Sequence, residues 1–425
     1  MSRRKKDVVV VGAGFSGLYL LHRLRSAGFS VTVFEKADQL GGTWHWNRYP
    51  GARCDIPSLQ YSYQFDEDLQ QDWNWTEKYS SQPEILEYLN HVADRFDLKK
   101  DIEFNTEVVA AKFNEEKSLW EIETSNEELE SKFCVMATGC LSAPNTPDFE
   151  GLKDYEGQLL HTGKWPQRPV DFTDETVAII GTGSSSIQAI PVIAEQVKHL
   201  YVFQRTANYS IPSNNGPTDP KEEADVKSRY HEFRKENWEN GFGIAGLEIE
   251  ALAVEAGEEE RKEKFNVHWE NEGLGFLGTY ADLMLDKNAN EMAAVFVREK
   301  IREKVKDPEI AELLRPGYTI GCKRLCVDSG YFEAFNRDNL TLIDLNTSPI
   351  TLITPEGLVA GKEEYSVDSI ILATGFDAMT GAVTRIDIRG RGGASLKDQW
   401  KNGAKSYLGL GISNFPNLFM VTGPG

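Results

Sequence analysis

One local pattern occurs twice in this chain, and it limits the possible folds more than any other feature. A short apolar run at residues 8–11 leads into a glycine-rich turn, and a second apolar run follows at 31–34. The same order returns at 177–180 and 200–203. Each copy predicts a buried strand, a helix that begins in the turn, and a second parallel strand. This internal repeat predicts an α/β fold with two Rossmann-like dinucleotide-binding domains.

The two turns differ at one glycine position. In the first turn, Gly12 permits the tight turn, Gly14 lets the backbone approach a pyrophosphate, and Gly17 allows close helix–strand packing. The second turn has Ser186 at the third position, which we expect the fold to tolerate. The N–H groups at the start of each helix favour phosphate binding. The candidate cofactor-binding residues are Gly12, Ala13, Gly14, Phe15, Ser16 and Gly17 in the first turn, and Gly181, Thr182, Gly183, Ser184, Ser185 and Ser186 in the second.

The residue that ends the second strand indicates which dinucleotide each turn binds. Glu35 and Gln204 both stand 23 residues after the first glycine of their turns. The carboxylate of Glu35 accepts hydrogen bonds from ribose hydroxyls and repels a 2′-phosphate. Gln204 is neutral, and the adjacent Arg205 offers a guanidinium for a phosphate. The first site therefore favours FAD or NAD and the second favours NADP, and two dinucleotides in one chain imply electron transfer between them.

Composition excludes several classes of protein. A net charge of −20 over 425 residues argues against binding to nucleic acid or to an anionic membrane. Five cysteines, an odd number, favour a reduced cytoplasmic protein over a disulfide framework. The basic run that starts at Arg3 imitates a signal peptide, but Gly12 and Gly14 interrupt the apolar segment behind it. We expect a buried first strand there.

The order of the segments predicts a discontinuous domain. Two further apolar strands, 134–137 and 370–373, each precede a Thr-Gly pair. We expect an FAD-binding domain formed by 1–140 and 330–425, which encloses an NADP-binding domain at 141–329. Within the latter, residues 217–316 are rich in Glu, Lys and Arg at helical spacing and predict a helical insert.

Disulfide reductases also combine a flavin with a nicotinamide site, and they require a redox-active cysteine pair. Here Cys54 stands alone, and Cys322 and Cys326 are too widely spaced for a CxxC motif. No group of His, Cys and carboxylate residues has the spacing of a metal site. We therefore interpret the thiols as buried or incidental.

The segment before the second repeat carries a family fingerprint: Tyr155, Gly157, His161, Trp165 and Pro166. With residues 44–55 and the Lys323-Arg324 pair, it resembles the type I Baeyer–Villiger monooxygenases, class B flavoproteins, and in particular their phenylacetone monooxygenase branch. The resemblance covers essentially the whole chain, although Tyr155 stands where the family usually has Phe. Without the family, His161 is best interpreted as a hydrogen-bonded linker histidine, and we assign it a role in domain coupling.

The resemblance implies that NADPH reduces FAD, that O₂ adds to the flavin, and that the resulting peroxide converts a ketone to an ester or lactone. Sulfide oxygenation is implied as a side activity. Arg324 would be the catalytic cation and Asp55 the carboxylate that orients it. Lys323 would lie near the 2′-phosphate of NADP. The further implied cofactor contacts are Arg53, Gln188, Arg205 and Thr206 for NADP, and Gly42, Thr43, Trp44, Asp55, Tyr61 and Val108 for FAD.

Two alternatives remain open at this point. Flavin monooxygenases that oxygenate nitrogen or sulfur have a similar linker without the Trp-Pro end. Family members also continue past the Gly-Pro-Gly at 423–425 with a segment that helps to shape the substrate pocket. The sequence is therefore also compatible with a truncated flavin-binding chain that does not turn over. The identity of the ketone cannot be read from the sequence, because fold does not set substrate.

Overall fold

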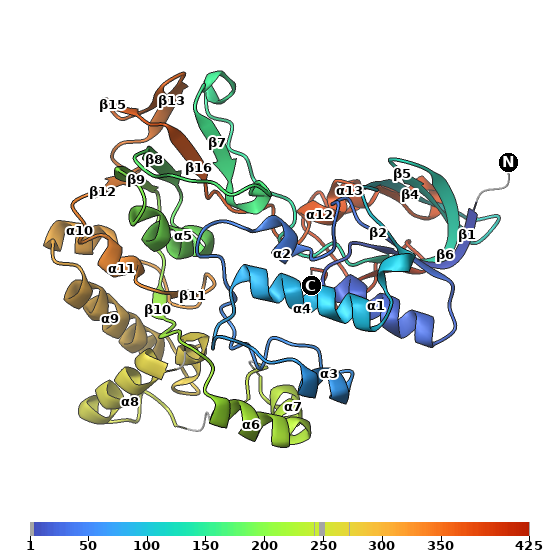
Figure 1. Cartoon of the computed structure of the whole chain (residues 1–425), viewed down its shortest axis with the longest axis horizontal. Coiled ribbons are helices and arrows are strands. Elements are labelled where there is room, and N and C mark those ends of the chain that lie inside the picture. Colours follow the sequence, from blue (N-terminus) through green and yellow to red (C-terminus); the bar gives the residue numbers. More distant parts are fainter. Residues whose placement is uncertain (1–3, 242, 246–250, 272, 425) are drawn as a thin grey trace. The chain divides into compact units, whose positions relative to one another are not determined.

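The computed structural model describes residues 4–241, 243–245, 251–271 and 273–424, so Arg3, Gly425 and parts of the predicted insert lie outside the described residues. The chain forms two compact units (Figure 1). The first unit comprises Met1–Arg48, Pro83–Asn145 and Gly375–Gly425. The second comprises Tyr49–Gln82 and Thr146–Thr374.

The first unit is built on one eight-stranded sheet in the order β17-β4-β5-β6-β1-β2-β3, with β18 paired to β6. Strands β1, β2, β3 and β6 are mutually parallel, whereas β4, β5 and β6 form an antiparallel meander. Val9 and Val10 are fully buried at the centre, as expected for a β-branched run in a parallel sheet. The strands are β1 Arg4–Val11, β2 Val31–Phe34, β3 Ile102–Glu103, β4 Val108–Asn114, β5 Leu119–Thr124, β6 Glu128–Met136, β17 Asp387–Arg389 and β18 Leu418–Met420. The helices are α1 Phe15–Ser26, α2 Thr43–Trp46, α4 Gln82–Arg95, α12 Gly381–Thr384 and α13 Leu396–Gln399.

The second unit contains a five-stranded parallel sheet in the order β12-β9-β8-β16-β7. A three-stranded antiparallel sheet and a two-stranded pair accompany it. The strands of the parallel sheet are β7 Gln158–His161, β8 Thr176–Ile180, β9 His199–Gln204, β12 Leu340–Asp344 and β16 Ser369–Leu372. The smaller sheets contain β13 Ile350–Thr354, β14 Gly357–Ala360 and β15 Glu363–Ser366, and β10 Ser210–Pro212 with β11 Cys326–Asp328. The helices outside the insert are α3 Glu67–Asp72, α5 Ser184–Ala194 and α11 Tyr331–Ala334.

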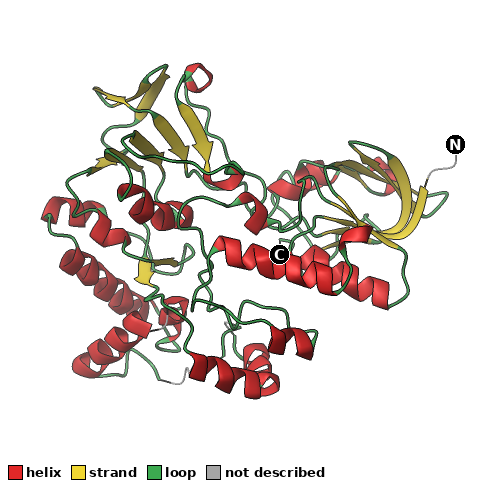
Figure 2. Ribbon diagram, in the orientation of Figure 1, coloured by secondary structure: helices red, strands yellow, loops and turns green. Residues whose placement is uncertain are grey.

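The insert predicted at 217–316 consists of helices and loops in its described residues (Figure 2). Asp286 and Asp307 cap the last two helices by accepting backbone N–H bonds. Phe265, Trp269 and Phe296 pack together in the core that the insert shares with the parallel sheet. The helices are α6 Pro220–Ser228, α7 Tyr230–Glu239, α8 Glu258–Asn271, α9 Lys287–Lys304 and α10 Pro308–Leu313.

The boundary between the units differs from the expected domain boundary. Residues 49–82 and 330–374 belong to the second unit, whereas we expected them in the first. For 330–374, strand pairing explains the difference, because β12 pairs with β9 and β16 pairs with β8 and β7. Residues 49–82 bond to other segments of the second unit, for example from the Lys78 N–H to the Gly216 carbonyl at 2.9 Å. The strands expected at 134–137 and 370–373 are β6 and β16, which pair with β1 and β8 respectively. Each unit thus places the strand before its Thr-Gly pair beside the first strand of its repeat.

Among the described residues, no helix is both long and apolar enough to cross a membrane.

Candidate active site

Two glycines of the first turn have no room for a side chain. Gly12 has φ +105°, and a Cβ there would lie 2.6 Å from the carbonyl oxygen of Ala137. A Cβ on Gly17 would lie 1.9 Å from the carbonyl oxygen of Gly12. The turn is closed by a bond from the Gly12 N–H to the Phe34 carbonyl at 2.8 Å. Only glycine fits these two positions, as the motif predicts.

The second turn repeats this backbone with one difference. Gly181 has φ +112°, and a Cβ there would lie 2.5 Å from the Ala373 carbonyl oxygen. Ser186, at the third position, is fully buried, and its hydroxyl donates to the Gly183 carbonyl at 3.2 Å. The fold therefore accommodates the serine and gives its hydroxyl a partner.

Both turns fit the phosphates of a dinucleotide. Helices α1 and α5 begin after Gly14 and Gly183, and in the described structure neither has a side-chain cap or an acidic residue in its first turn. A Cβ on Gly183 would meet no described atom within 4 Å, so the space in front of the α5 N-terminus is open. N–H groups at the positive end of a helix dipole suit a pyrophosphate.

The residues that end the second strands differ in their contacts. The buried carboxylate of Glu35 accepts the Ala13 N–H at 2.8 Å and the Ala37 N–H at 2.9 Å. Each oxygen keeps one lone pair for a ribose hydroxyl. The Gln204 amide donates to the Leu313 carbonyl at 2.7 Å, and its buried Oε1 has no hydrogen-bond partner among the described residues.

The cations predicted near a 2′-phosphate are in the second unit and exposed. Arg205 and Lys323 make no ion pair within the described part of the chain. The Lys323 ammonium lies over the ring of Tyr318, 4.7 Å from its centroid. The Thr182 hydroxyl donates to the Thr206 carbonyl at 2.9 Å, which joins the glycine-rich turn to the segment after Gln204. Arg205, which directly follows the strand-end Gln204, and Lys323 are exposed cations of the kind that bind a phosphate.

The structure brings Asp55 and Arg324 together, although 269 residues separate them. The Nε atom of Arg324 donates to Oδ2 of Asp55 at 2.9 Å, and Nη2 donates to Oδ1 at 2.7 Å. Asp55 is 17% exposed and Arg324 is 61% exposed, so a fixed guanidinium faces open space. The hydrogen bonds to Asp55 raise the pKa of Arg324 above its ordinary value. The pair can therefore present a permanent, oriented positive charge.

Neutral thiols flank this pair. Burial raises the pKa of Cys54 and that of Cys326 to about 12, so both stay protonated at neutral pH. All five cysteines are free. Among the described residues, no group of three His, Cys or carboxylate side chains is placed to hold a metal ion.

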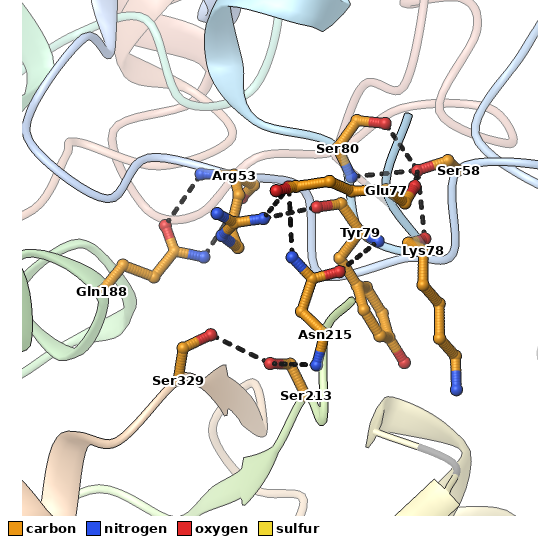
Figure 3. Close-up of polar contacts among 10 residues, drawn as sticks. All are labelled: Arg53, Ser58, Glu77, Lys78, Tyr79, Ser80, Gln188, Ser213, Asn215 and Ser329. Atoms are coloured by element: carbon orange, nitrogen blue, oxygen red, sulfur yellow. Dashed lines mark hydrogen bonds and ion pairs between the residues drawn. The ribbon is translucent and has the colours of Figure 1, made fainter. Parts of the chain in front are cut away.

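The loop that carries Asp55 is held by a polar network that sequence reasoning missed (Figure 3). Arg53, expected along NADP, uses Nη1 to donate to Glu77 at 2.7 Å and to the Tyr79 carbonyl at 2.6 Å. The Asn215 amide also donates to Glu77, at 3.1 Å. Gln188, the other residue expected along NADP, bonds the backbone of Arg53. These hydrogen-bonded partners are 24 to 138 residues apart in the sequence, so no local pattern signals this network.

The residues expected around FAD fall into two sets. Gly42 has φ +54°, and a Cβ there would lie 2.9 Å from the Cα of Gly14, so residues 42–44 lie against the first turn. Thr43 opens α2, and Trp44 is buried beside it. Val108, also in the first unit, is buried at the start of β4. Asp55 and the half-buried Tyr61 belong to the second unit.

The residues of the linker fingerprint make hydrogen bonds and packing contacts within the second unit. Nδ1 of the buried His161 accepts the Gly163 N–H at 2.9 Å, and the Tyr155 hydroxyl donates to the Val367 carbonyl at 2.9 Å. A Cβ on Gly157 would lie 2.3 Å from that hydroxyl, and Trp165 packs on Phe172. These contacts agree with a hydrogen-bonded linker histidine, and its role in domain coupling stays a prediction.

Comparison with known proteins agrees with this site. Residues 9–271 match the family model described as pyridine nucleotide-disulphide oxidoreductase. A Baeyer–Villiger monooxygenase of Pseudooceanicola batsensis is 44% identical over 98% of this chain and 77% of its own length. A solved steroid monooxygenase bound to NADP is 50% identical with a TM-score of 0.96, over 99% of this chain and 81% of that one. A cyclohexanone monooxygenase with ε-caprolactone bound is 41% identical with a TM-score of 0.97, over 99% and 83%. This chain belongs to the Baeyer–Villiger monooxygenase family.

Proposed function

We propose that this chain, with FAD and NADPH bound, inserts one oxygen atom of O₂ into ketones to give esters or lactones. The observation that carries the proposal is the bidentate Asp55–Arg324 contact in a chain with two dinucleotide-type turns. The lactone bound to the related cyclohexanone monooxygenase supports this product class.

The chemistry that activates O₂ would come from FAD held at the first turn and reduced by NADPH. Arg324 supplies a positive charge that does not titrate at working pH, because an arginine stays protonated and Asp55 raises its pKa further. A fixed cation of this kind stabilises negative charge that develops on oxygen during the reaction. Asp55 orients the guanidinium, and the neutral thiols of Cys54 and Cys326 add no competing charge.

The two turns divide the cofactors between them in this proposal. The turn 12–17 and Glu35 bind FAD, with the carboxylate accepting a ribose hydroxyl. The turn 181–186 binds NADPH, and Arg205, Thr206 and Lys323 surround its 2′-phosphate. Support comes from the open α5 N-terminus and from the exposed Arg205 and Lys323.

The first test identifies products. The purified protein, NADPH and O₂ are incubated with a mixed panel of ketones, sulfides and amines, and mass spectrometry assigns the products. Ester or lactone from ketones is the expected result. Product from amines alone would replace the proposal with an N-oxygenating activity, and hydrogen peroxide alone would replace it with a flavin-binding chain that does not oxygenate.

The second test isolates Arg324. In Arg324→Ala we expect flavin to be retained and NADPH to be consumed, while ester formation falls by about 10²- to 10³-fold and hydrogen peroxide appears instead. Arg302→Ala is the matched control, because Arg302 is also exposed and paired with a carboxylate, that of Glu312. Ester formation at the parental rate in Arg324→Ala would contradict the catalytic role.

A further inference from the structure

The side chain of Gln188, on α5, makes three hydrogen bonds to the loop that ends at Asp55. The Tyr49 hydroxyl donates to Oε1 of Gln188 at 2.9 Å, and the Arg53 N–H donates to the same oxygen at 3.4 Å. In return, Nε2 of Gln188 donates to the Arg53 carbonyl at 3.1 Å (Figure 3). The residue is 9% exposed. Both ends of this buried amide are therefore engaged by the loop.

The loop backbone also lies directly on the helix. Gly51 has φ +80°, and a Cβ there would lie 2.3 Å from the carbonyl oxygen of Gln188 and 3.1 Å from Cγ2 of Val192. Any larger residue at position 51 would push the loop off α5. Glycine thus permits the approach, and the Gln188 amide fixes it.

The loop is also hydrogen-bonded to residues 80–82, so it is held both there and by Gln188. The Cys54 N–H donates to the Ser80 carbonyl at 3.0 Å, and the Gln82 N–H donates to the Ala52 carbonyl at 2.9 Å. Asp55 follows these anchored residues directly. Its carboxylate position is set by this backbone, and from there it makes the bidentate contact with Arg324.

The other member of the pair is supported by the same helix. Strand β11 begins at Cys326, two residues after Arg324, and packs against α5. Helix α5 itself begins in the second glycine-rich turn. One helix therefore supports the dinucleotide-type turn, the loop of Asp55 and the strand after Arg324.

We propose that Gln188 is a positioning residue for oxygen transfer. It holds the loop 49–55 on α5 so that Asp55 keeps Arg324 oriented, and it acts through Asp55 rather than by binding the nucleotide with its amide. The kinetic part of this inference rests on the proposed function. The structural part concerns only how the loop is held.

Gln188→Met tests the inference, because it keeps the length of the side chain and removes both ends of the amide. Gln196→Met is the matched control, since Gln196 is exposed just beyond the end of α5. We expect amide hydrogen exchange in residues 52–56 to quicken by about tenfold or more in Gln188→Met and to stay unchanged in the control. Tyr49→Phe removes one of the three bonds and should shift the same amides less. Unchanged exchange in Gln188→Met would overturn the inference whether or not the chain oxygenates ketones.

Kinetics then separate positioning from nucleotide binding. Misplacement of the pair should lower ester formation in Gln188→Met by about 10- to 100-fold and divert NADPH to hydrogen peroxide, while the KM for NADPH changes by less than about threefold. A raised KM with unchanged ester yield would assign Gln188 to the nucleotide and overturn the inference.

A double-mutant cycle completes the test. If Gln188 acts through Asp55, adding Gln188→Met to Asp55→Asn should cost little more than Asp55→Asn alone. Losses that simply multiply would show an independent role and overturn the inference. If the parental chain makes no ester, the proposed function fails, while hydrogen exchange still decides how the loop is held.

Discussion

The two repeat units share one backbone but hold it with different side chains. In both, the first glycine has a positive φ, +105° at Gly12 and +112° at Gly181. A Cβ on either would lie 2.6 or 2.5 Å from the carbonyl oxygen at the end of the neighbouring strand. In the first unit, the buried Glu35 carboxylate holds the turn by accepting a hydrogen bond from the Ala13 N–H. In the second, the amide of Gln204 points to Leu313 instead. There, the Thr182 hydroxyl ties the turn to the Thr206 carbonyl.

This difference separates the features that would bind any dinucleotide from those that would select a particular one. The shared backbone offers N–H groups to phosphates without regard to the rest of the ligand. The residue at the end of the second strand differs: it is a buried carboxylate in the first unit and a neutral amide beside exposed Arg205 in the second. In the proposed assignment, this residue sets the charge near the ribose. The following variants test this division.

The largest effect should come from Gly17→Ser, which gives the first turn the residue found in the second. A Cβ at position 17 lies 1.9 Å from the Gly12 carbonyl oxygen, so the turn must shift. Forced overpacking typically costs about 1–3 kcal/mol or more of the free energy of unfolding. We expect most of the bound flavin to be lost, as measured by absorbance of the purified protein. Stoichiometric flavin in this variant would show that the two turns are interchangeable.

Arg205→Ala should have the next largest effect, and only on the second site. Loss of a charge-assisted hydrogen bond costs about 1.5–3 kcal/mol, which raises the KM for NADPH by roughly 10- to 150-fold. The KM for NADH should change little, because NADH lacks the 2′-phosphate. Steady-state kinetics with both nucleotides measure the ratio, and flavin content serves as the control. Equal use of NADH and NADPH by the parental protein would refute the assignment of this site.

Exchanging the strand-end residues tests the comparison most directly. In the parental protein, both carboxylate oxygens of Glu35 accept a backbone N–H. In Glu35→Gln, one of these N–H groups faces an amide NH₂ instead, which leaves a buried donor unpaired at a cost of about 1–3 kcal/mol. Flavin should dissociate more readily while NADPH binding is spared. Gln204→Glu should instead weaken NADPH by charge repulsion and spare the flavin. Measuring flavin content and NADPH affinity in both variants reveals whether the two sites have been assigned in reverse.

These comparisons also show what the sequence could predict. Both turns were predictable because their tightest constraints are local: Gly17 meets Gly12 in its own turn, and Gly12 and Gly181 each meet a carbonyl oxygen at a recognisable strand end. The membership of residues 330–374 was not, since it depends on pairing of β12 and β16 with strands far away in the sequence. The Asp55–Arg324 contact came from the family resemblance alone. The contact of Gln188 with Arg53 spans 135 residues and leaves no periodic signal, so only the structure reveals it.

Ser186→Gly should have the smallest effect, and it is the reciprocal of the first variant. It restores the third glycine of the motif, yet the structure already accommodates the serine, whose hydroxyl donates to the Gly183 carbonyl. Removing that bond and placing glycine in the first turn of α5 should each cost up to about 1 kcal/mol. We expect the melting temperature to fall by a few degrees at most (about 2–4 °C per kcal/mol in a unit of this size), with little change in NADPH affinity. Thermal unfolding and NADPH titration measure the two. A stabilised protein, or NADPH bound about tenfold more tightly, would show that Ser186 strains the second turn. In that case the second turn would carry backbone strain that the first turn lacks, although the two share one backbone conformation.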